Sequence, residues 1–199
     1  MNLISAEIIA DSLNQHQERI TTFKLVFPRF ILAELNTHRV FSKNSASSRA
    51  IPFRKMVKSA LEDPFIPMAF QKEHPGMQGT KYLDIDKLYS LPEAVIILMK
   101  VFKYTNEEIL LSARENDPIV NHIFDIVGDD IGIEQSLQDW WLYCRDQAVK
   151  SAIIMSSLGV TKQICNRILE PFLYHTVLLT ASHFENFFNL RCPSYRVGG

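Results

Sequence analysis

The spacing of apolar residues changes along the chain and predicts strands near both ends with helices between them. Residues 20–27, ITTFKLVF, are rich in β-branched and aromatic side chains and end at Pro28, which is typical of a strand. Residues 172–180 predict a second strand, and residues 2–10 are expected to pair with a strand of this kind. In the middle of the chain, apolar residues recur every three or four positions, which predicts helices over 94–104, 106–115 and 136–158, the last stopped by Gly159.

Proline and threonine indicate where shorter helices begin. Proline is favoured at a helix start, so a short helix is expected over about 28–37 and another over 52–61. Thr161 is suited to cap a helix over 162–170, because its hydroxyl can accept a hydrogen bond from a free backbone N–H. Pro171 must stop that helix.

Serine-rich and proline-rich stretches predict a last helix, a loop and two irregular segments. The spacing Ser-x-x-Glu at 182–185 matches a capping box and predicts a last helix to about residue 191. Residues 42–48, SKNSASS, carry side chains that compete with the backbone for hydrogen bonds, so a loop or a helix-entry turn is expected there. Residues 63–80 and the tail 192–199 are expected to be irregular.

Strands at both ends of the chain around a helical middle predict an α+β fold. The N- and C-terminal segments would meet in one antiparallel sheet. A length of 199 residues suits a single domain, 1–199, whose core is large enough to be stable without disulfides or a metal. The chain is 47% hydrophobic and 22% charged, which is typical of a globular protein.

Charge and composition narrow the class of function. The net charge of −1 argues against a protein that coats nucleic acid. Residues 29–62 nevertheless carry seven Lys and Arg against two acids, a local excess that suits a small phosphorylated ligand. The longest apolar run, 94–99, is far shorter than the roughly 20 residues of a membrane span. The first residues lack the basic start of a signal peptide, and three scattered cysteines fit a reducing compartment, so a cytoplasmic protein without a membrane partner is expected.

The densest group of polar side chains lies in residues 37–49, THRVFSKNSASSR. This segment offers two guanidinium groups, an ammonium group, an imidazole and four serine hydroxyls. Arginine presents a planar fork that matches phosphate oxygens, and hydroxyls add neutral donors, so the segment is suited to hold a phosphate. The alternative interpretation is a solvated surface turn, which residue types alone do not exclude.

The spacing within this segment resembles the signature Arg-His-Arg-x-x-Ser-x-Asn-x-x-Ser-x-Arg of the flavin-dependent thymidylate synthases, the ThyX family. Six of the seven specified positions match, and the exception is Thr37 in place of the first Arg. Residues 82–135 have no counterpart and look like a helical insertion within a single ThyX-like domain. The further segments that look like phage-type members of the family are 76–78, 159–163, 166–172 and 186–191.

The resemblance implies an enzyme with a bound cofactor. Members of the family form homotetramers with active sites shared between subunits and bind FAD. They convert dUMP to dTMP with methylenetetrahydrofolate as carbon donor and NADPH as reductant. The flavin rather than a cysteine handles the transfer, so the protein has to hold nucleotide, folate and flavin in contact.

The resemblance also implies roles for individual residues. Ser47 and Arg49 would hold the phosphate of dUMP, with Arg167 as a second phosphate ligand. Arg191 would contact the uracil ring and favour ionisation at N3, so Arg191 and Ser47 are the expected catalytic residues. The set implied around dUMP is Glu34, Thr37, Ser45, Ala46, Ser47, Ser48, Arg49, Arg167 and Arg191. The set implied around FAD is Thr37, His38, Arg39, Ser45 and Asn186.

Several positions depart from the family pattern. Thr37 removes a cation that touches both flavin and nucleotide in the family, and Ser45 stands where many members have Glu. Glu34 stands where many have Gln, and because a carboxylate only accepts hydrogen bonds, it would prefer a base edge with more donors, such as the amino group of cytosine. The family's Ala-Gln pair after Arg191 and its C-terminal extension are absent. A catalytically degenerate protein that binds nucleotide or serves in assembly is therefore the main alternative.

Individual residues also have structural interpretations. Arg167 is suited to a surface ion pair with Glu170, and Arg191 is a favourable cation at the end of a helix. The aromatic residues of the last predicted helix are expected in the core rather than in a stacking platform; they are Phe184, Phe187 and Phe188.

Two other classes of protein are weaker matches. A thymidylate synthase or hydroxymethylase with a cysteine nucleophile would use Cys144, Cys165 or Cys192, and none has an obvious activating histidine beside it. A nucleic-acid-binding module would use the basic patch 29–58, but the chain has no recognisable motif of that class. The histidines show no spacing typical of metal ligands, so no metal is expected.

Overall fold

The computed structural model describes residues 4–75, 79–115 and 117–192. The chain divides into two compact units, one formed by residues 1–66 with 144–199 and the other by residues 67–143. The first unit contains the sheet and all the predicted site residues. Of the features expected from the sequence, the segment 76–78 and the tail from 193 to 199 lie outside the described residues.

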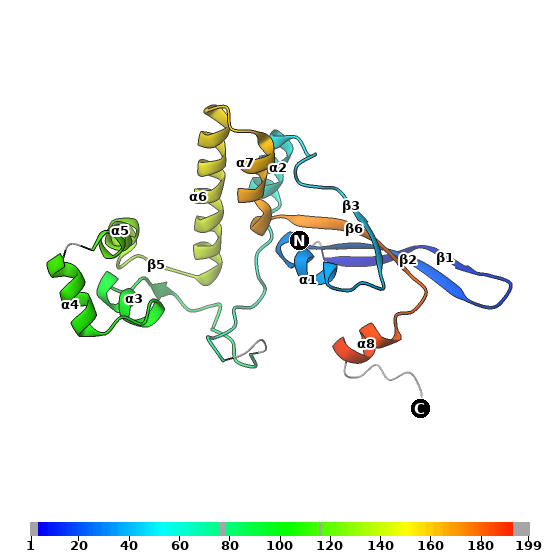
Figure 1. Ribbon diagram of the computed structural model, residues 1–199, viewed down its shortest axis with the longest axis horizontal. Coiled ribbons are helices and arrows are strands. Elements are labelled where there is room, and N and C mark those ends of the chain that lie inside the picture. Colours follow the sequence, from blue (N-terminus) through cyan, green and yellow to red (C-terminus); the bar gives the residue numbers. More distant parts are fainter. Residues whose placement is uncertain (1–3, 76–78, 116, 193–199) are drawn as a thin grey trace. The chain divides into compact units, whose positions relative to one another are not determined.

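The first unit is built on a four-stranded antiparallel sheet with the strand order β1-β2-β6-β3 (Figure 1). The strands are β1 (Ser5–Leu13), β2 (Arg19–Pro28), β3 (Ser42–Ser45) and β6 (Tyr174–Ala181). The strands predicted over 20–27 and 172–180 are confirmed by β2 and β6, which lie side by side. The α+β fold with one antiparallel sheet from the two ends of the chain is therefore confirmed.

β6 is the strand around which the core of the sheet is organised, because it pairs with both β2 and β3. Its side chains alternate between a buried and a more exposed face, which is the period of a strand with one face on the core. Phe27, Phe41 and the partly buried Phe184 and Phe187 pack against that buried face, so two of the three aromatic residues expected in the core are found there, and the partly buried Phe188 is not part of this cluster. The buried residues of β6 are His175, Val177, Leu179 and Ala181.

Helices complete the first unit. After Pro28 the chain forms a 3-10 turn, η1 (Arg29–Ile31), and the short helix α1 (Leu32–Asn36), which confirms the helix expected there. Thr161 caps α7 by accepting a hydrogen bond from Gln163 N at 3.4 Å, also as expected. The other elements are α2 (Phe53–Glu62), α6 (Leu137–Ser157), α7 (Lys162–Ile168), η3 (Glu170–Phe172) and α8 (Glu185–Arg191).

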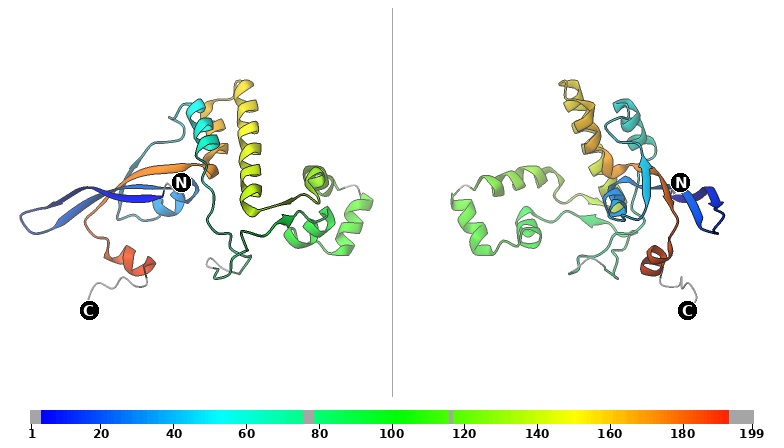
Figure 2. Two further views of the ribbon diagram at one scale, coloured as in Figure 1. Left: turned by 180° about the vertical axis from the view of Figure 1, so that it is seen from behind. Right: turned by 45° about the vertical axis from the view of Figure 1, so that its right-hand side comes forward.

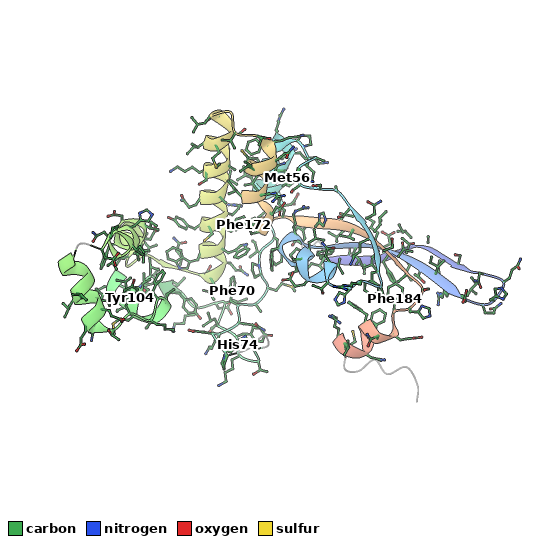
Figure 3. All side chains as sticks on the ribbon, in the orientation of Figure 1. Met56, Phe70, His74, Tyr104, Phe172 and Phe184 are labelled. Carbon is green, nitrogen blue, oxygen red and sulfur yellow. The ribbon has the colours of Figure 1, made fainter. Side chains whose placement is uncertain are left out.

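A second core holds α2, α6 and α7 together beside the start of β6. Met56 from α2 lies within this core, and Phe172 of η3 lies where the chain enters β6 (Figure 3). Gly159 has φ +86°, a left-handed conformation that favours glycine and lets the chain turn from α6 into α7. The buried members of this core are Met56, Ala60, Val149, Ala152, Leu169 and Leu173.

The second unit is mainly helical. Its helices α3 (Ala94–Val101) and α4 (Asn106–Glu115) confirm the helices predicted there, and α5 (Pro118–Val127) was not distinguished from the sequence. Leu98, Ile109 and Val120 form its core. The short strands β4 (Tyr89–Ser90) and β5 (Glu134–Gln135) pair antiparallel, and the 3-10 turn η2 (Gly128–Asp130) precedes β5. That residues 82–135 are an insertion stays a prediction.

Two predictions from local sequence were wrong. Residues 42–45 form an edge strand rather than a loop, because β6 offers hydrogen-bonding partners that outweigh the turn preference of serine and asparagine. Ser182 does not cap α8: the N-cap is Phe184, and the Ser182 hydroxyl lies 2.8 Å from Nδ1 of His183. Within the described residues, no helix combines the length and apolar character needed to cross a bilayer.

Candidate functional site

Two arginines that are far apart in the sequence line one open pocket. Arg49 comes from the turn that follows β3, and Arg167 comes from α7. Both guanidinium side chains belong to exposed residues, and the pocket has a volume of about 560 Å³. Gln163, Ile164 and Ile168 of α7 complete its lining. The structure therefore brings together the two arginines that the family resemblance implies as phosphate ligands.

The turn that carries Arg49 is held against α7 by hydrogen bonds from two side chains. Asn166 Nδ2 donates to the carbonyl oxygens of Ser48 and Ile51 at 2.7 and 2.9 Å. Lys162 Nζ donates to Ala50 O at 3.4 Å. Within the turn itself, Ala50 N donates to Ser47 O at 3.0 Å. Ser47 and its predicted partners Ser45 and Ala46 are exposed, whereas Ser48 is 3% exposed.

The two pocket arginines carry charge that the described part of the chain does not neutralise. Among the residues that the structure describes, neither Arg49 nor Arg167 has an acidic partner. Glu170, which the sequence allowed as a partner of Arg167, instead lies 3.3 Å from Nε of Arg29. Two unpaired cations lining one pocket create a positive potential that attracts an anion.

A second group of predicted residues lies at the other end of β3. The ring of His38 is 5.2 Å from the ring of Phe187, and the guanidinium carbon of Arg191 is 4.8 Å from the same ring. Burial, and then the positive charges of Arg191 and Lys43, lower the pKa of His38 below its ordinary value of 6.5. His38 is therefore neutral at pH 7 and can donate one hydrogen bond and accept another.

The rest of this group lies on the surface around His38. Arg39 and Asn186 are exposed, and Asn186 is the residue of α8 that immediately precedes Phe187 in the sequence. Arg191 is the last residue of α8, so the helix-end interpretation of this cation is also correct. Glu34 and Thr37 are exposed too, and Thr37 Oγ1 donates to the carbonyl oxygen of Glu34 at 2.7 Å.

Lys43 fixes the segment that carries His38, a role that the sequence did not indicate. Its Nζ donates to the carbonyl oxygens of Leu35, Asn36 and His38 at 3.2, 3.4 and 2.6 Å. These carbonyls lie at and just beyond the end of α1, where a helix lacks backbone partners and favours a positive charge. The only signal in the sequence is the position of a lysine five residues after His38.

The two groups are well separated within one chain. α7 precedes β6 and α8 follows it, and Figures 1 and 2 show the two helices at opposite ends of this strand. Eight residues of strand rise by roughly 23 Å at about 3.3 Å per step. Phe184, labelled in Figure 3, lies at the α8 end, whereas Met56 lies at the α7 end. One chain therefore does not place Arg167 and Arg191 on the same mononucleotide.

A smaller pocket of about 210 Å³ contains a buried arginine–histidine pair that the sequence did not reveal. Arg29 Nη1 lies 2.6 Å from His175 Nδ1, and the two residues are 8% and 4% exposed. Arginine has only donors, so Nδ1 of His175 accepts and the ring proton lies on Nε2. Burial, and then the charge of Arg29, lower the pKa of His175 to about 4 against a smaller opposite effect of Glu170.

The cysteines lie in positions that do not suit a shared nucleophilic site. Cys165 is fully buried, and its thiol donates to Val160 O at 3.5 Å. Cys144 and Cys192 are exposed. In the described part of the chain, no group of three or more His, Cys, Asp or Glu side chains is arranged to hold a metal ion.

Comparisons with known proteins give matches among solved structures only. No family model and no curated protein matches the chain. Among solved structures, the chain is similar to a crystal structure of a UMP/dUMP methylase PolB from Streptomyces cacaoi bound with 5-Br UMP. The match covers 90% of this chain and 71% of that chain, with 13% sequence identity and a TM-score of 0.45. A similarity this low supports no conclusion about function.

Proposed function

We propose that this protein is a flavin-dependent thymidylate synthase that methylates dUMP to dTMP, with methylenetetrahydrofolate as carbon donor and NADPH as reductant. The observation that carries the proposal is the shared pocket of Arg49 and Arg167, which come from opposite halves of the chain. Both were implied as phosphate ligands by the resemblance of residues 38–49 and 166–172 to this enzyme family. The fold brings them together without an acidic partner among the described residues.

The pocket suits the phosphate of a mononucleotide. Two guanidinium forks provide charged donors, and the exposed hydroxyl of Ser47 adds a neutral donor from the same turn. A phosphate monoester carries a charge near −2 at pH 7, which two arginines match. The phosphate would fix the nucleotide so that its base points away from α7, toward the part of the site that supplies Arg191.

Arg191 acts on the base in this proposal. A cation beside the uracil ring stabilises the anion formed when N3 loses its proton, which activates C5 toward the carbon donor. Because β6 separates Arg167 from Arg191, the Arg191 that meets the base comes from another copy of the chain. The proposal therefore requires active sites shared between copies of the chain, and the family resemblance implies that the copies form a homotetramer.

The residues around His38 fit the isoalloxazine ring of FAD. Neutral His38 is half-buried against Phe41 and Phe187 and offers one donor and one acceptor, and exposed Arg39 and Asn186 add further polar donors. When bound, FAD supplies the redox chemistry that the side chains lack. Thr37 supplies no cation to this group, and its hydroxyl donates to Glu34 O.

The activity is tested by flavin-dependent release of tritium from dUMP tritiated at C5, measured with and without methylenetetrahydrofolate. We expect release with the folate, purified protein that is yellow, and flavin freed by denaturation. Binding of dUMP without tritium release would instead favour a catalytically degenerate nucleotide-binding protein. Steep salt dependence of binding to many nucleic-acid sequences would favour a nucleic-acid module.

The phosphate pocket is tested by two arginine variants and a matched control. Arg49→Ala and Arg167→Ala each remove a charged hydrogen-bond donor, so each is expected to weaken dUMP binding by about 2 kcal/mol, about 30-fold. Arg54→Ala removes an exposed arginine that lines a different pocket, on α2, and is expected to bind dUMP as the parent does. Equal affinity of the parent and the three variants for dUMP would contradict the assignment of the phosphate site.

A further inference from the structure

We propose that Asn166 is a positioning residue that sets the spacing of Arg49 and Arg167, and so gives the site its preference for a nucleoside monophosphate over the free nucleoside. The inference rests on the proposed function. Asn166 immediately precedes Arg167 on α7, and its partner Ser48 immediately precedes Arg49 in the turn after β3. The hydrogen bond between them therefore joins the two arginine-bearing segments one residue before each arginine.

The side-chain amide nitrogen of Asn166 donates two hydrogen bonds to the same turn. Its nitrogen donates to Ser48 O at 2.7 Å and to Ile51 O at 2.9 Å, so it closes both ends of the Ser48–Ile51 turn onto α7. Both partners are carbonyl oxygens, which only accept hydrogen bonds. The NH2 group of Asn166, and not its oxygen, must therefore face the turn. Asn166 is 0% exposed and does not line the arginine pocket, so it acts through the turn and not on a ligand.

The burial of Asn166 argues for a specific role. Among the described residues its Oδ1 has no hydrogen-bond partner, and an unpaired buried acceptor is costly to retain. Cys165 and Leu169 beside it on α7 are buried apolar residues, so a leucine at 166 would suit the packing of this face. The two donated hydrogen bonds are what an apolar residue would lose.

Two other contacts support this link less specifically. Ile51 packs against the second core, but an apolar contact has no direction and does not fix the orientation of the turn. Lys162 Nζ reaches Ala50 O at only 3.4 Å from an exposed position, where water competes for the same oxygen. Loss of the amide donors would free the turn to move relative to α7. A phosphate site made of two guanidinium groups depends on their relative position. Movement of the turn would therefore weaken binding of the phosphate more than binding of the nucleoside.

The experiment compares Asn166→Leu, Asn166→Ser and the parent in binding of dUMP and of deoxyuridine, with KM and kcat for dUMP. Leucine keeps the branched shape without a donor, and serine keeps one donor. We expect Asn166→Leu to weaken dUMP binding at least about tenfold and Asn166→Ser by less, with deoxyuridine binding within about twofold of the parent. KM for dUMP should rise while kcat and flavin content stay near those of the parent, because Asn166 is buried and its side chain donates only to the turn that carries Arg49.

The control is Gln71→Leu, which removes an amide-to-carbonyl hydrogen bond, to Gly79 O at 3.1 Å, in the other unit of the chain. It should leave both affinities unchanged. The inference is overturned if the Asn166 variants lose dUMP and deoxyuridine binding in parallel, or lose neither. Should Asn166→Leu fail to fold, the inference is tested by comparing the affinities of Asn166→Ser and the parent for dUMP and deoxyuridine. Failure of the parent protein to bind dUMP would instead overturn the proposed function.

Discussion

The imidazole of His175 is held in one tautomer and one protonation state by its neighbours. Arg29 approaches Nδ1 at 2.6 Å, and a guanidinium group cannot accept a hydrogen bond, so Nδ1 must be unprotonated. Protonation of the ring would place two positive charges in contact at a site that is 4% exposed. Burial and the charge of Arg29 accordingly lower its pKa to about 4.

The lowered pKa of His175 predicts a loss of stability in acid. In the unfolded chain the pKa of histidine is about 6.5, so the unfolded state binds more protons than the folded state between about pH 6.5 and pH 4. The free energy of unfolding should therefore fall by about 2 kcal/mol from pH 7 to pH 4.5 on account of this residue. Urea unfolding at both pH values measures it. His175→Gln keeps an acceptor for Arg29 but does not titrate there, and an unchanged pH dependence in this variant would contradict the assignment.

A second prediction at the residue scale concerns the choice of pyrimidine. Glu34 is an exposed carboxylate on α1, beside the segment that carries Thr37 and His38. A carboxylate only accepts hydrogen bonds, whereas glutamine can also donate to the O4 of uracil. Glu34→Gln should therefore shift the ratio of kcat/KM for dUMP over dCMP upward by about tenfold. Glu62→Gln on α2 is the control, and a strict preference of the parent protein for dUMP would refute the role of Glu34.

At the scale of elements, β3 connects the two halves of the candidate site. The strand is polar and short, and it depends on β6 for its backbone partners. Lys43 within it holds the end of α1, and the turn after it carries Ser47 and Arg49. β3 therefore fixes both the His38 segment and the arginine turn relative to the sheet.

Loss of the Lys43 ammonium group should loosen the end of α1. Lys43→Met leaves the carbonyls of Leu35 and His38 without a charged donor, so the free energy of unfolding is expected to fall by about 1–2 kcal/mol. The flavin content of the purified protein should fall as well, because His38 loses its fixed position. Lys58→Met removes an exposed pair with Glu62 at 3.7 Å and should change stability by less than about 0.5 kcal/mol. Equal stability and flavin content in the two variants would contradict the role of Lys43.

At the scale of the whole molecule, the separation of Arg167 from Arg191 determines how an active site can form. Arg167 is on α7 and Arg191 is on α8, two helices at opposite ends of β6 (Figure 1), and a strand of eight residues holds its ends roughly 23 Å apart at about 3.3 Å per residue step. A mononucleotide is shorter than this distance. An active site that uses both arginines therefore needs more than one copy of the chain.

Shared active sites predict complementation between impaired variants. At a dUMP concentration well below the KM of the variants, a mixture of Arg49→Ala and Arg191→Ala should release more tritium than either variant alone, because some sites then combine an intact Arg49 turn from one chain with an intact Arg191 from another. A mixture of Arg49→Ala and Arg167→Ala should release no more than the separate variants, because these two residues line one pocket within a single chain. Light scattering of the parent protein should give about four times 22.9 kDa. A monomer, or equal behaviour of the two mixtures, would refute the shared site.

Much of the secondary structure and the identity of the candidate site residues could be predicted without the fold. β2 and β6 follow from runs of apolar, β-branched and aromatic residues, and α3, α4 and α6 follow apolar periodicity. The start of α2 follows from a proline, and the Thr161 cap of α7 follows from a hydroxyl beside a helix start. These features depend on residues a few positions apart. The segment 37–49 also revealed its unusual density of cations and hydroxyls from the sequence alone.

The tertiary structure decided the contacts between distant segments. Residues 42–45 became a strand because β6 lies beside them, and the capping box at 182–185 did not form because Phe184 packs against the sheet core. The links from Asn166 to Ser48 and from Arg29 to His175 join residues 118 and 146 positions apart. No local pattern encodes such pairs, because the strength of a buried hydrogen bond depends on which groups the folded chain removes from water together.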